Sequence, residues 1–443
     1  MEPSALTEPA LEAARGLLGT EPLRALERLR SEYGADLAAA AWTQAQLRER
    51  AVEKFGPDAW TMLFTPAGLE QSTRAPVAAH RTARLRGRGS VLDLGCGIGG
   101  DLRALVTAVS RVVGVERDPV TAACAAHNAP AATIVVADAV EHALSGFDVV
   151  FADPARRNGR GRVFRPNDYS PPWPWLRDLL MSRDAAAKVA PGIPHDLVPL
   201  SVEAEWVSWE GEVKEAALWS GSLATPGVTR RATLLRREPG GRGPDGRGVP
   251  AKPMTTAPPG GAMLRETGQP GQAGQAGHAQ QAGQKPQTSD VAPPSGAVVS
   301  EPAVTAHTLT SSGMTAQTGS LGRWLHEPDA AVIRAGLVAE AAALVEGRLL
   351  DPTIAYVTTD ADTSSPYTRR WEVLESLPFS LKRLREVLRA RGVGRLDVKK
   401  RGSAIEPDQL RRDLKLRGDA HAVVVVTRLA GQPLAIVCRP PVS

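Results

Sequence analysis

Residues 90–101, SVLDLGCGIGGD, constrain the fold of this chain more than any other stretch. A short apolar strand, Ser90–Leu94, leads directly into a glycine-rich turn, and the helical pattern DLRALVTAV follows it. Gly95, Gly97 and Gly99 have no Cβ, so the backbone of this turn allows a ligand to approach closely. The N-terminus of the following helix presents free N–H groups to polar ligand atoms. The stretch therefore predicts a ligand-binding strand–turn–helix unit of an α/β sheet.

The residues around this turn alternate between short apolar strands and helical stretches. Strand candidates are Ser90–Leu94, Arg111–Val115, Thr133–Val136, Phe147–Ala152 and Ala186–Ala190. Two alternating runs on either side of Gly211 follow them and predict an antiparallel hairpin. Strands joined by crossover helices are typical of parallel sheets. We therefore expect a doubly wound α/β, Rossmann-like sheet over residues 86–237, with seven strands that end in this hairpin.

Composition divides the rest of the chain. Residues 1–85 are rich in Ala, Leu, Glu and Arg at helical spacing and predict a helical N-terminal region. Residues 238–320 contain no aromatic residue, no Ile and only two Leu, so they cannot bury enough apolar surface to offset the entropy of ordering. We expect a disordered low-complexity linker there, and a helical connector with one strand over 321–376. Residues 377–443 predict a small α+β domain in the order β-α-β-α-β-β.

Positive charge is concentrated at the C-terminal end of the sequence. Residues 377–443 carry 15 Lys and Arg against 6 Asp and Glu, which gives +9. The other 376 residues carry 38 against 42, which gives −4. A basic module on an acidic body indicates a polyanionic partner, although a solvated helix face explains the same charges. Lys399, Lys400 and Arg401 are the candidates for contact with a phosphate backbone.

Acidic residues follow four successive strands of the expected sheet. Asp93 and Glu116 lie at the ends of the first two strands, Asp138 follows the third, and Asp153 with Pro154 follows the fourth. The carboxyl ends of parallel strands meet at one edge of a sheet, where ligands bind. There, Glu116 is placed to accept hydrogen bonds from ribose hydroxyls, and Asp138 lies within reach of an adenine amino group. Asp153 lies where the topology places the reacting group of the ligand.

The glycine turn alone leaves two nucleoside cofactors open. Gly95, Gly97 and Gly100 satisfy the GxGxxG pattern, and Glu116 lies about 20 residues farther on, as in dinucleotide-binding folds. Asp93 favours S-adenosylmethionine (SAM), because its carboxylate would repel a pyrophosphate and attract the ammonium group of an amino acid. NAD is the less favoured alternative.

On these motifs the sequence resembles the class I SAM-dependent methyltransferases. VLDLGCGIGG is similar to their first motif, Glu116 to their ribose-binding acid, Asp138 to their adenine-contacting acid and DPAR to their fourth motif. The whole chain resembles bacterial members with a C-terminal THUMP-like domain, on segments such as FADPARR, WLHEPDAAVIRAGL, PFSLKRLR and VKKRG. This resemblance implies SAM as the cofactor and RNA as a partner. FTPAGLEQST is similar to a segment that covers the cofactor in cap-guanine N2-methyltransferases, which implies Thr65, Gln71 and Ser72 as further candidates.

The fourth motif departs from the pattern of methyltransferases that act on base amino groups. That pattern is Asp, Asn or Ser followed by Pro-Pro and an aromatic residue. Asp153 and Pro154 match it, whereas Ala155 replaces the second Pro and Arg156 replaces the aromatic residue. An acceptor for an amino N–H survives, so Asp153, Pro154 and Arg156 are the catalytic candidates. The stacking aromatic is missing or is supplied by one residue of a downstream set, Phe164, Tyr169 and Trp173.

The loop after this motif, RRNGRGRVFR, is rich in arginine. Arginine side chains both clamp phosphates and stack on bases, so Arg157 and Arg160 are candidates for binding a nucleic-acid substrate. The alternative is that the arginines which directly follow the motif, Arg156 and Arg157, pair with acids of their own domain.

Other chemistries find little support in the sequence. Cys96, Cys124 and Cys438 form no CxxC pair and the His residues are scattered, so we expect no metal site. The apolar runs are too short to span a membrane and the N-terminus is acidic, so we expect a cytoplasmic protein without membrane association. We predict a SAM-dependent methyltransferase that modifies a base nitrogen of RNA, with the basic C-terminal domain holding the RNA. Methyl transfer to a small molecule or a protein, and RNA binding without catalysis, remain the alternatives. The sequence carries no information on the oligomeric state.

Overall fold

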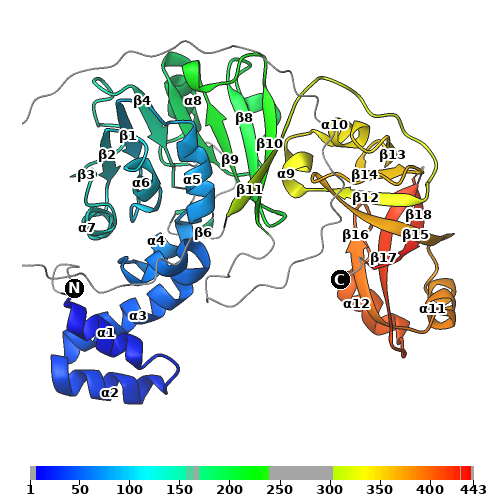
Figure 1. The fold of residues 1–443 in the computed structure, drawn as a ribbon, viewed down its shortest axis with the longest axis horizontal. Helices are drawn as coiled ribbons and strands as arrows, with labels where there is room; N and C mark the ends of the chain where they lie inside the picture. The colour runs from blue at the N-terminus through cyan, green and yellow to red at the C-terminus, as the bar shows by residue number, and fades with distance from the viewer. Residues whose placement is uncertain are drawn as a thin grey trace, which may run out of the picture. The chain divides into compact units, whose positions relative to one another are not determined.

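The structure is a computed structural model, and it describes residues 6–155, 157–158, 161–162, 169–238, 303–429 and 431–440 (Figure 1). The candidates Arg156, Arg160 and Phe164 lie outside the described residues, and of Arg157 only the backbone is described. No helix in this part of the chain is long and apolar enough to cross a membrane.

The N-terminal region is helical, as its spacing of apolar residues predicts. In chain order it contains α1 (Glu8–Gly16), α2 (Pro22–Tyr33), α3 (Ala35–Phe55), the 3-10 turn η2 (Gly56–Trp60), α4 (Pro66–Gln71) and α5 (Ala75–Ala83). The first three helices pack around small and apolar side chains, among them Ala14, Leu29 and Trp42. The segment from η2 to α5 then brings the chain to the sheet that follows.

A nine-stranded sheet has the order β11-β10-β8-β9-β7-β4-β1-β2-β3. Its strands are β1 (Ser90–Leu94), β2 (Arg111–Glu116), β3 (Thr133–Val136), β4 (Val149–Ala152), β7 (Ala185–Val189), β8 (Glu203–Trp209), β9 (Glu212–Trp219), β10 (Arg230–Arg237) and β11 (Val304–Thr310). Strands β3, β2, β1, β4 and β7 are parallel, and β9 is antiparallel to β7 and β8. The crossover helices are α6 (Gly100–Leu105), α7 (Pro119–Asn128) and α8 (Trp173–Ser182). The doubly wound fold with its terminal hairpin is therefore confirmed.

The sheet has two strands more than the seven that were expected. β10 pairs in parallel with β8, and β11 pairs antiparallel with β10, from Arg231 opposite Thr310 to Arg237 opposite Val304. The prediction of a disordered linker over 238–320 is therefore wrong for residues 304–310, and residues 239–302 of it lie outside the described part of the chain. The average composition of that segment hides the short alternating run VTAHTLT, which has the period of a strand.

A second sheet has the order β13-β14-β12-β15-β18-β17-β16. Its strands are β12 (Trp324–Pro328), β13 (Arg348–Asp351), β14 (Ile354–Thr359), β15 (Thr368–Pro378), β16 (Val393–Lys400), β17 (Ala420–Leu429) and β18 (Gln432–Cys438). The helices α11 (Leu381–Ala390) and α12 (Pro407–Leu414) pack their leucines against one face of this sheet. The expected boundary at residue 377 falls inside β15, so the proposed connector over 321–376 supplies strands to the same sheet.

The single helical stretch expected over 328–346 is divided into α9 (Ala330–Arg334) and α10 (Val338–Ala343). Gly336 lies between them with φ of +69°, a left-handed conformation that ends the first helix. Apolar side chains of this pair, including Val332 and Leu337, belong to the apolar core beside the nine-stranded sheet.

Helix α5 lies against the nine-stranded sheet (Figure 1). Buried ion pairs join α5 and the residues that follow it to this sheet. Arg81 donates to Glu215 of β9 at 2.7 Å, and Arg84 donates to Glu203 of β8 at 2.7 Å. His80 pairs with the buried Glu205 of β8 at 2.8 Å. Cations in a protein interior require such partners, because an unpaired buried charge is strongly destabilising. These pairs therefore fix the position of α5 on the sheet.

Glu205 provides a test of this interface. Burial opposes its ionisation, but His80, Arg84 and Thr233 outweigh burial and lower its pKa from 4.5 to about 2. A carboxyl with a lowered pKa stabilises the fold above its unfolded pKa, and the stabilisation is lost as the pH falls towards 2. Glu205→Gln should therefore lower the free energy of unfolding at pH 7 by about 3 kcal/mol, and by progressively less below pH 4.5.

Urea unfolding of both proteins at pH 7 and pH 3 measures the difference. Glu212→Gln, which changes an exposed carboxylate of the adjacent strand, is the control and should change stability little at either pH. An equal loss for Glu205→Gln at both pH values would show that the charge of this carboxylate contributes nothing.

Candidate active site

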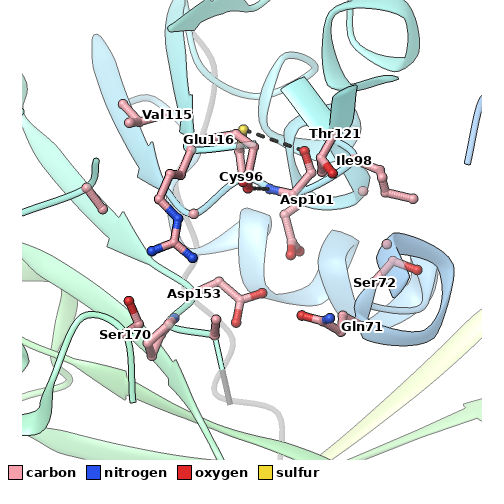
Figure 2. Close-up of a pocket in the computed structure, with 18 of the residues that line it drawn as sticks. Gln71, Ser72, Cys96, Ile98, Asp101, Val115, Glu116, Thr121, Asp153 and Ser170 are labelled. Carbon is pink, nitrogen blue, oxygen red and sulfur yellow. Dashed lines mark hydrogen bonds between the residues drawn. The ribbon is translucent and has the colours of Figure 1, made fainter. Parts of the chain in front are cut away.

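A cavity of about 340 Å³ opens at the carboxyl ends of the parallel strands (Figure 2). Its walls come from the glycine turn after β1, from the segments after β2, β3 and β4, from β7, and from α4 with the turn that follows it. The lining side chains include Thr65, Gln71, Ser72, Thr73, Cys96, Ile98, Asp101, Glu116, Asp138, Asp153, Pro154 and Lys188. Six of the nine residues predicted to be catalytic or cofactor-binding thus meet around one space: Glu116, Asp138, Asp153, Pro154, Gly95 and Gly97.

The three glycines of the turn have different roles. All three have positive φ, at +84° for Gly95, +57° for Gly97 and +80° for Gly99. A Cβ on Gly95 would lie 2.8 Å from the carbonyl oxygen of Asp153, and one on Gly99 would lie 3.1 Å from the Cα of Ala125. Gly97 has nothing within 4 Å of that position. Gly95 and Gly97 line the cavity, whereas Gly99 does not and is required for packing against α7.

Backbone amides hold the two carboxylates that were predicted to bind a nucleoside. Glu116 accepts hydrogen bonds from the N–H of Gly97 at 3.1 Å and from the N–H of Asp118 at 2.9 Å, one on each oxygen. Asp138 accepts from the N–H of Val140 at 3.0 Å. Both side chains are therefore oriented before any ligand arrives, with lone pairs left to accept from ligand hydroxyls or amines.

Asp93 does not line the cavity, contrary to the expectation from the sequence. It shares a face of β1 with Val91, beneath the turn, and its side chain is fully buried. Neither of its carboxylate oxygens has a hydrogen-bond partner among the described residues. Burial raises the pKa of Asp93 well above its usual range, and the nearby Asp101 and Asp153 raise it further.

Asp101, at the start of α6, lines the cavity instead. It accepts hydrogen bonds from Arg81 at 2.8 Å and from the hydroxyl of Thr73 at 3.0 Å. Burial opposes its ionisation, but the charges of Arg81 and Lys188 and the hydrogen bond from Thr73 outweigh burial, so the pKa of Asp101 is lowered. An ionised carboxylate is thus present at the cavity, but it belongs to Asp101, eight residues after Asp93, which the motif suggested.

Asp153 lines the cavity after β4 and is ion-paired with Lys188 of β7. Its side chain is 23% exposed, whereas that of Lys188 is 5% exposed. Figure 2 shows the carboxylate of Asp153 pointing into the space bordered by Asp101 and Gln71. The candidate aromatics Tyr169 and Trp173 are buried in the apolar core and do not line the cavity.

The segment from Thr65 to Thr73 covers one side of the cavity, and α3 holds it there. The Nζ of Lys54 donates to the carbonyl oxygens of Leu69, Glu70 and Ser72 at 2.6, 2.9 and 2.8 Å. Burial, with the nearby charges of Arg74 and Lys188, lowers the pKa of Lys54 to about 8. Thr65, Gln71 and Ser72 line the cavity as the resemblance implies.

Sequence reasoning missed four residues of this site: Thr73, Arg81, Asp101 and Lys188. The sequence did contain signals for two of them. Asp101 directly follows the glycine turn, and Lys188 is the one charged residue in the apolar strand AAAKV. Arg81 lies on α5, nine residues before the motif begins at Ser90, but its partner Glu215 is 134 residues away, so no local pattern indicated the pair.

Of the candidates for substrate binding, Lys399, Lys400 and Arg401 are not among the residues that line this cavity. The backbone of Arg157 belongs to a short strand, β5 (Arg157–Asn158), paired with β6 (Gly161–Arg162). The side chains of Lys399 and Arg401 both approach Glu327, each at 3.5 Å, and Lys400 is ion-paired with Glu406. All three candidates of the C-terminal module thus have a carboxylate partner.

Comparisons with known proteins agree with this geometry. Family models match at residues 92–154 (methyltransferase domain), 368–440 (THUMP domain-like) and 8–51 (a domain of unknown function). The chain is similar to a proposed methyltransferase from Porphyromonas gingivalis W83, with a TM-score of 0.67 at 20% identity over 99% of both chains, which shows the same fold.

Two proteins of Mycobacterium tuberculosis, from strains CDC 1551 / Oshkosh and ATCC 25618 / H37Rv, are similar over nearly the whole chain. Both are described as uncharacterized S-adenosylmethionine-dependent methyltransferases. Each is 36% identical over 412 residues, which cover 89% of this chain and 95% of the relative. Together with the methyltransferase domain around the glycine turn, this similarity shows that SAM is the cofactor. The chain belongs to the S-adenosylmethionine-dependent methyltransferases.

Proposed function

We propose that this methyltransferase transfers the methyl group of SAM to a base nitrogen of RNA. The observation that carries the proposal is Asp153, a partly exposed carboxylate that is followed by Pro154 at the cavity and held in place by a buried cation. A carboxylate in this position suits an acceptor that presents N–H groups, such as a base amino group. The THUMP domain-like match over 368–440 supports RNA as the substrate class.

The residues around the cavity fit SAM. The open space beside Gly97 admits a ligand close to the backbone, and Glu116 keeps free lone pairs for a ribose diol. Asp138 is oriented for the adenine amino group. The ionised Asp101 at the cavity suits the ammonium group of the methionine moiety.

SAM supplies a methyl group that is already activated on a sulfonium sulfur. The chain therefore has to bind the acceptor, orient its nitrogen and exclude water. In our proposal Asp153 accepts a hydrogen bond from the acceptor amino group and stabilises the positive charge that develops on the nitrogen. Pro154 stiffens the backbone at this position. A backbone carbonyl there accepts a hydrogen bond from the second N–H of the acceptor amino group. The segment from Thr65 to Thr73, held by Lys54, keeps water out on one side.

The RNA surface that we propose differs in its residues from the one suggested by the sequence. Within the described part of the C-terminal module, Arg395, Lys415 and Arg417 have neither an ion pair nor a side-chain hydrogen bond, unlike Lys399, Lys400 and Arg401. We name these three residues the unpaired patch. Cations without carboxylate partners give up no ion pair when they bind a phosphate, so they contribute more to RNA binding.

Backbone contact between two glycines brings the unpaired patch together. A Cβ on Gly394 would lie 1.8 Å from the carbonyl oxygen of Gly418, so the start of β16 and the loop before β17 touch. Arg395 and Arg417 directly adjoin these glycines in sequence, and Lys415 lies two residues before Arg417. Exposed Asp419 is also in this loop, but the group remains net positive.

Glu116→Gln should weaken SAM binding by about 10- to 100-fold, because hydrogen bonds from the ribose to a charged acceptor are worth roughly 1.5–3 kcal/mol. Isothermal titration calorimetry with SAM measures the loss. Glu141→Gln, an exposed change that does not line the cavity, is the control and should bind like the wild type. Equal affinity in the two variants would argue against the ribose role of Glu116.

Asp153→Asn should bind SAM within about threefold of the wild type but transfer methyl roughly 100-fold more slowly, because it removes charge stabilisation that matters only in the transition state. The assay follows labelled methyl from SAM into total RNA of cells that lack this protein, and digestion of the RNA then identifies the base. Transfer into protein or small molecules, with none into RNA, would assign another substrate class. Full RNA methylation by the variant would show that Asp153 has no catalytic role.

The triple variant of the unpaired patch, R395Q/K415Q/R417Q, should weaken RNA binding and flatten its salt dependence. Each lost phosphate contact lowers the slope of log K against log salt by roughly 0.7 for single-stranded RNA. The matched control K399Q/K400Q/R401Q removes the same number of charges from ion-paired positions and should change the slope less. Fluorescence anisotropy of a labelled RNA at several salt concentrations measures both. A larger change of affinity and salt slope in the control variant would show that Lys399, Lys400 and Arg401 bind the RNA instead.

A further inference from the structure

Lys188 is a buried cation in a strand that otherwise carries only small apolar residues. β7 reads AAAKV, and every residue of it is buried, Lys188 being 4% exposed. Its Nζ contacts two groups that also line the cavity, the carboxylate of Asp153 and the hydroxyl oxygen of Thr73, the latter at 2.9 Å. The cation therefore lies in the wall of the active site and not at the surface.

The direction of the hydrogen bonds around Lys188 follows from the donors that are present. Thr73 donates its hydroxyl hydrogen to Asp101 at 3.0 Å, so its oxygen accepts from Lys188. Lys188 has no acceptor capacity and donates to Thr73 and to Oδ2 of Asp153 at once. Asp101 is anchored in turn by Arg81 at 2.8 Å. The orientation of Asp153 thus depends on a chain of contacts that begins on α5.

Stability alone does not explain a lysine at this position. Buried ion pairs are often replaced by apolar residues of similar volume without loss of stability, because desolvation offsets their attraction. The neighbouring positions of β7 show that this strand accommodates Ala and Val. A lysine in this place therefore calls for a role in the site itself.

We propose that Lys188 is a positioning residue that acts through Asp153. It binds Oδ2 of Asp153, which leaves Oδ1 directed at the methyl acceptor, and Thr73 fixes Lys188 in that geometry. The inference rests on the proposed function of Asp153. It extends that function to the segment before the glycine turn, because Thr73 belongs to the turn between α4 and α5.

The test compares Lys188→Met, Asp153→Asn and the double variant in the full-length protein. With RNA as acceptor, Lys188→Met should lower kcat by about 10- to 100-fold while KM for SAM stays within about threefold, because misplacing a reacting group affects the chemical step. The double variant should be no slower than Asp153→Asn alone, since Lys188 acts only through Asp153. Lys214→Met, which changes a lysine on β9 paired with Glu212, is the control and should keep its activity.

Substitutions of Thr73 separate positioning from general damage to the fold. Thr73→Ser retains the hydroxyl and should keep more activity than Thr73→Val, which retains the shape but loses the oxygen that accepts from Lys188. Similar kcat values for the Thr73→Ser and Thr73→Val variants would contradict the proposal. Multiplicative losses in the double variant, or wild-type kcat in Lys188→Met, would also overturn it.

A measurement without substrate distinguishes failure of this inference from failure of the proposed function. Asp153→Asn leaves Lys188 without its carboxylate and should lower Tm, and adding Lys188→Met should restore part of the loss. If the wild-type protein methylates no RNA, the proposed function fails, but this coupling in Tm still decides whether the two side chains act as a unit. Additive changes in Tm would overturn the role of Lys188 independently of any RNA.

Discussion

The buried guanidinium of Arg81 is the interaction on which the site depends. Arg81 is 3% exposed and binds two carboxylates from different elements, Glu215 of β9 and Asp101 of α6. A cation at this depth has to remain paired, so α5 cannot shift without leaving a charge in the interior. Since α5 is covalently continuous with Thr73 and α4, this requirement also places one wall of the cavity.

The carboxylates of the site are held by two kinds of partner, and the kind of partner matches the role that we propose. Glu116 and Asp138 are oriented by backbone amides, which are fixed by the fold and carry no net charge. Asp101 and Asp153 are oriented by the charged side chains of Arg81 and Lys188. Nucleoside recognition requires fixed geometry, whereas the methyl-transfer end of the site requires control of charge as well.

Local sequence patterns were enough to predict the parts of the fold and site that depend on neighbouring residues. The strand–turn–helix unit at Gly95 and the carboxylates at Glu116, Asp138 and Asp153 all follow from strand ends and a single turn. The burial of Asp93 was not predictable in this way, because it depends on which face of β1 packs in the apolar cluster with Leu102 and Leu105 of α6. The pairing of Arg81 with Glu215, and of Lys399 and Arg401 with Glu327, joins residues far apart in the chain. The strand β11 was missed because the composition of its seven residues was averaged with that of a much longer segment.

The pairing of β10 with β11 has a practical consequence for work on this protein. Arg237 at the end of β10 lies opposite Val304 at the start of β11. The end of one strand and the start of the other are therefore adjacent, although more than 60 residues separate them in sequence. Closing a loop costs free energy that grows only with the logarithm of its length, so the sheet tolerates a wide range of lengths at this point. We therefore expect the sheet to accept a short turn in place of the intervening segment, or a fluorescent or affinity module inserted there. The edge of the sheet thus offers an attachment point that belongs to neither the cofactor cavity nor the unpaired patch.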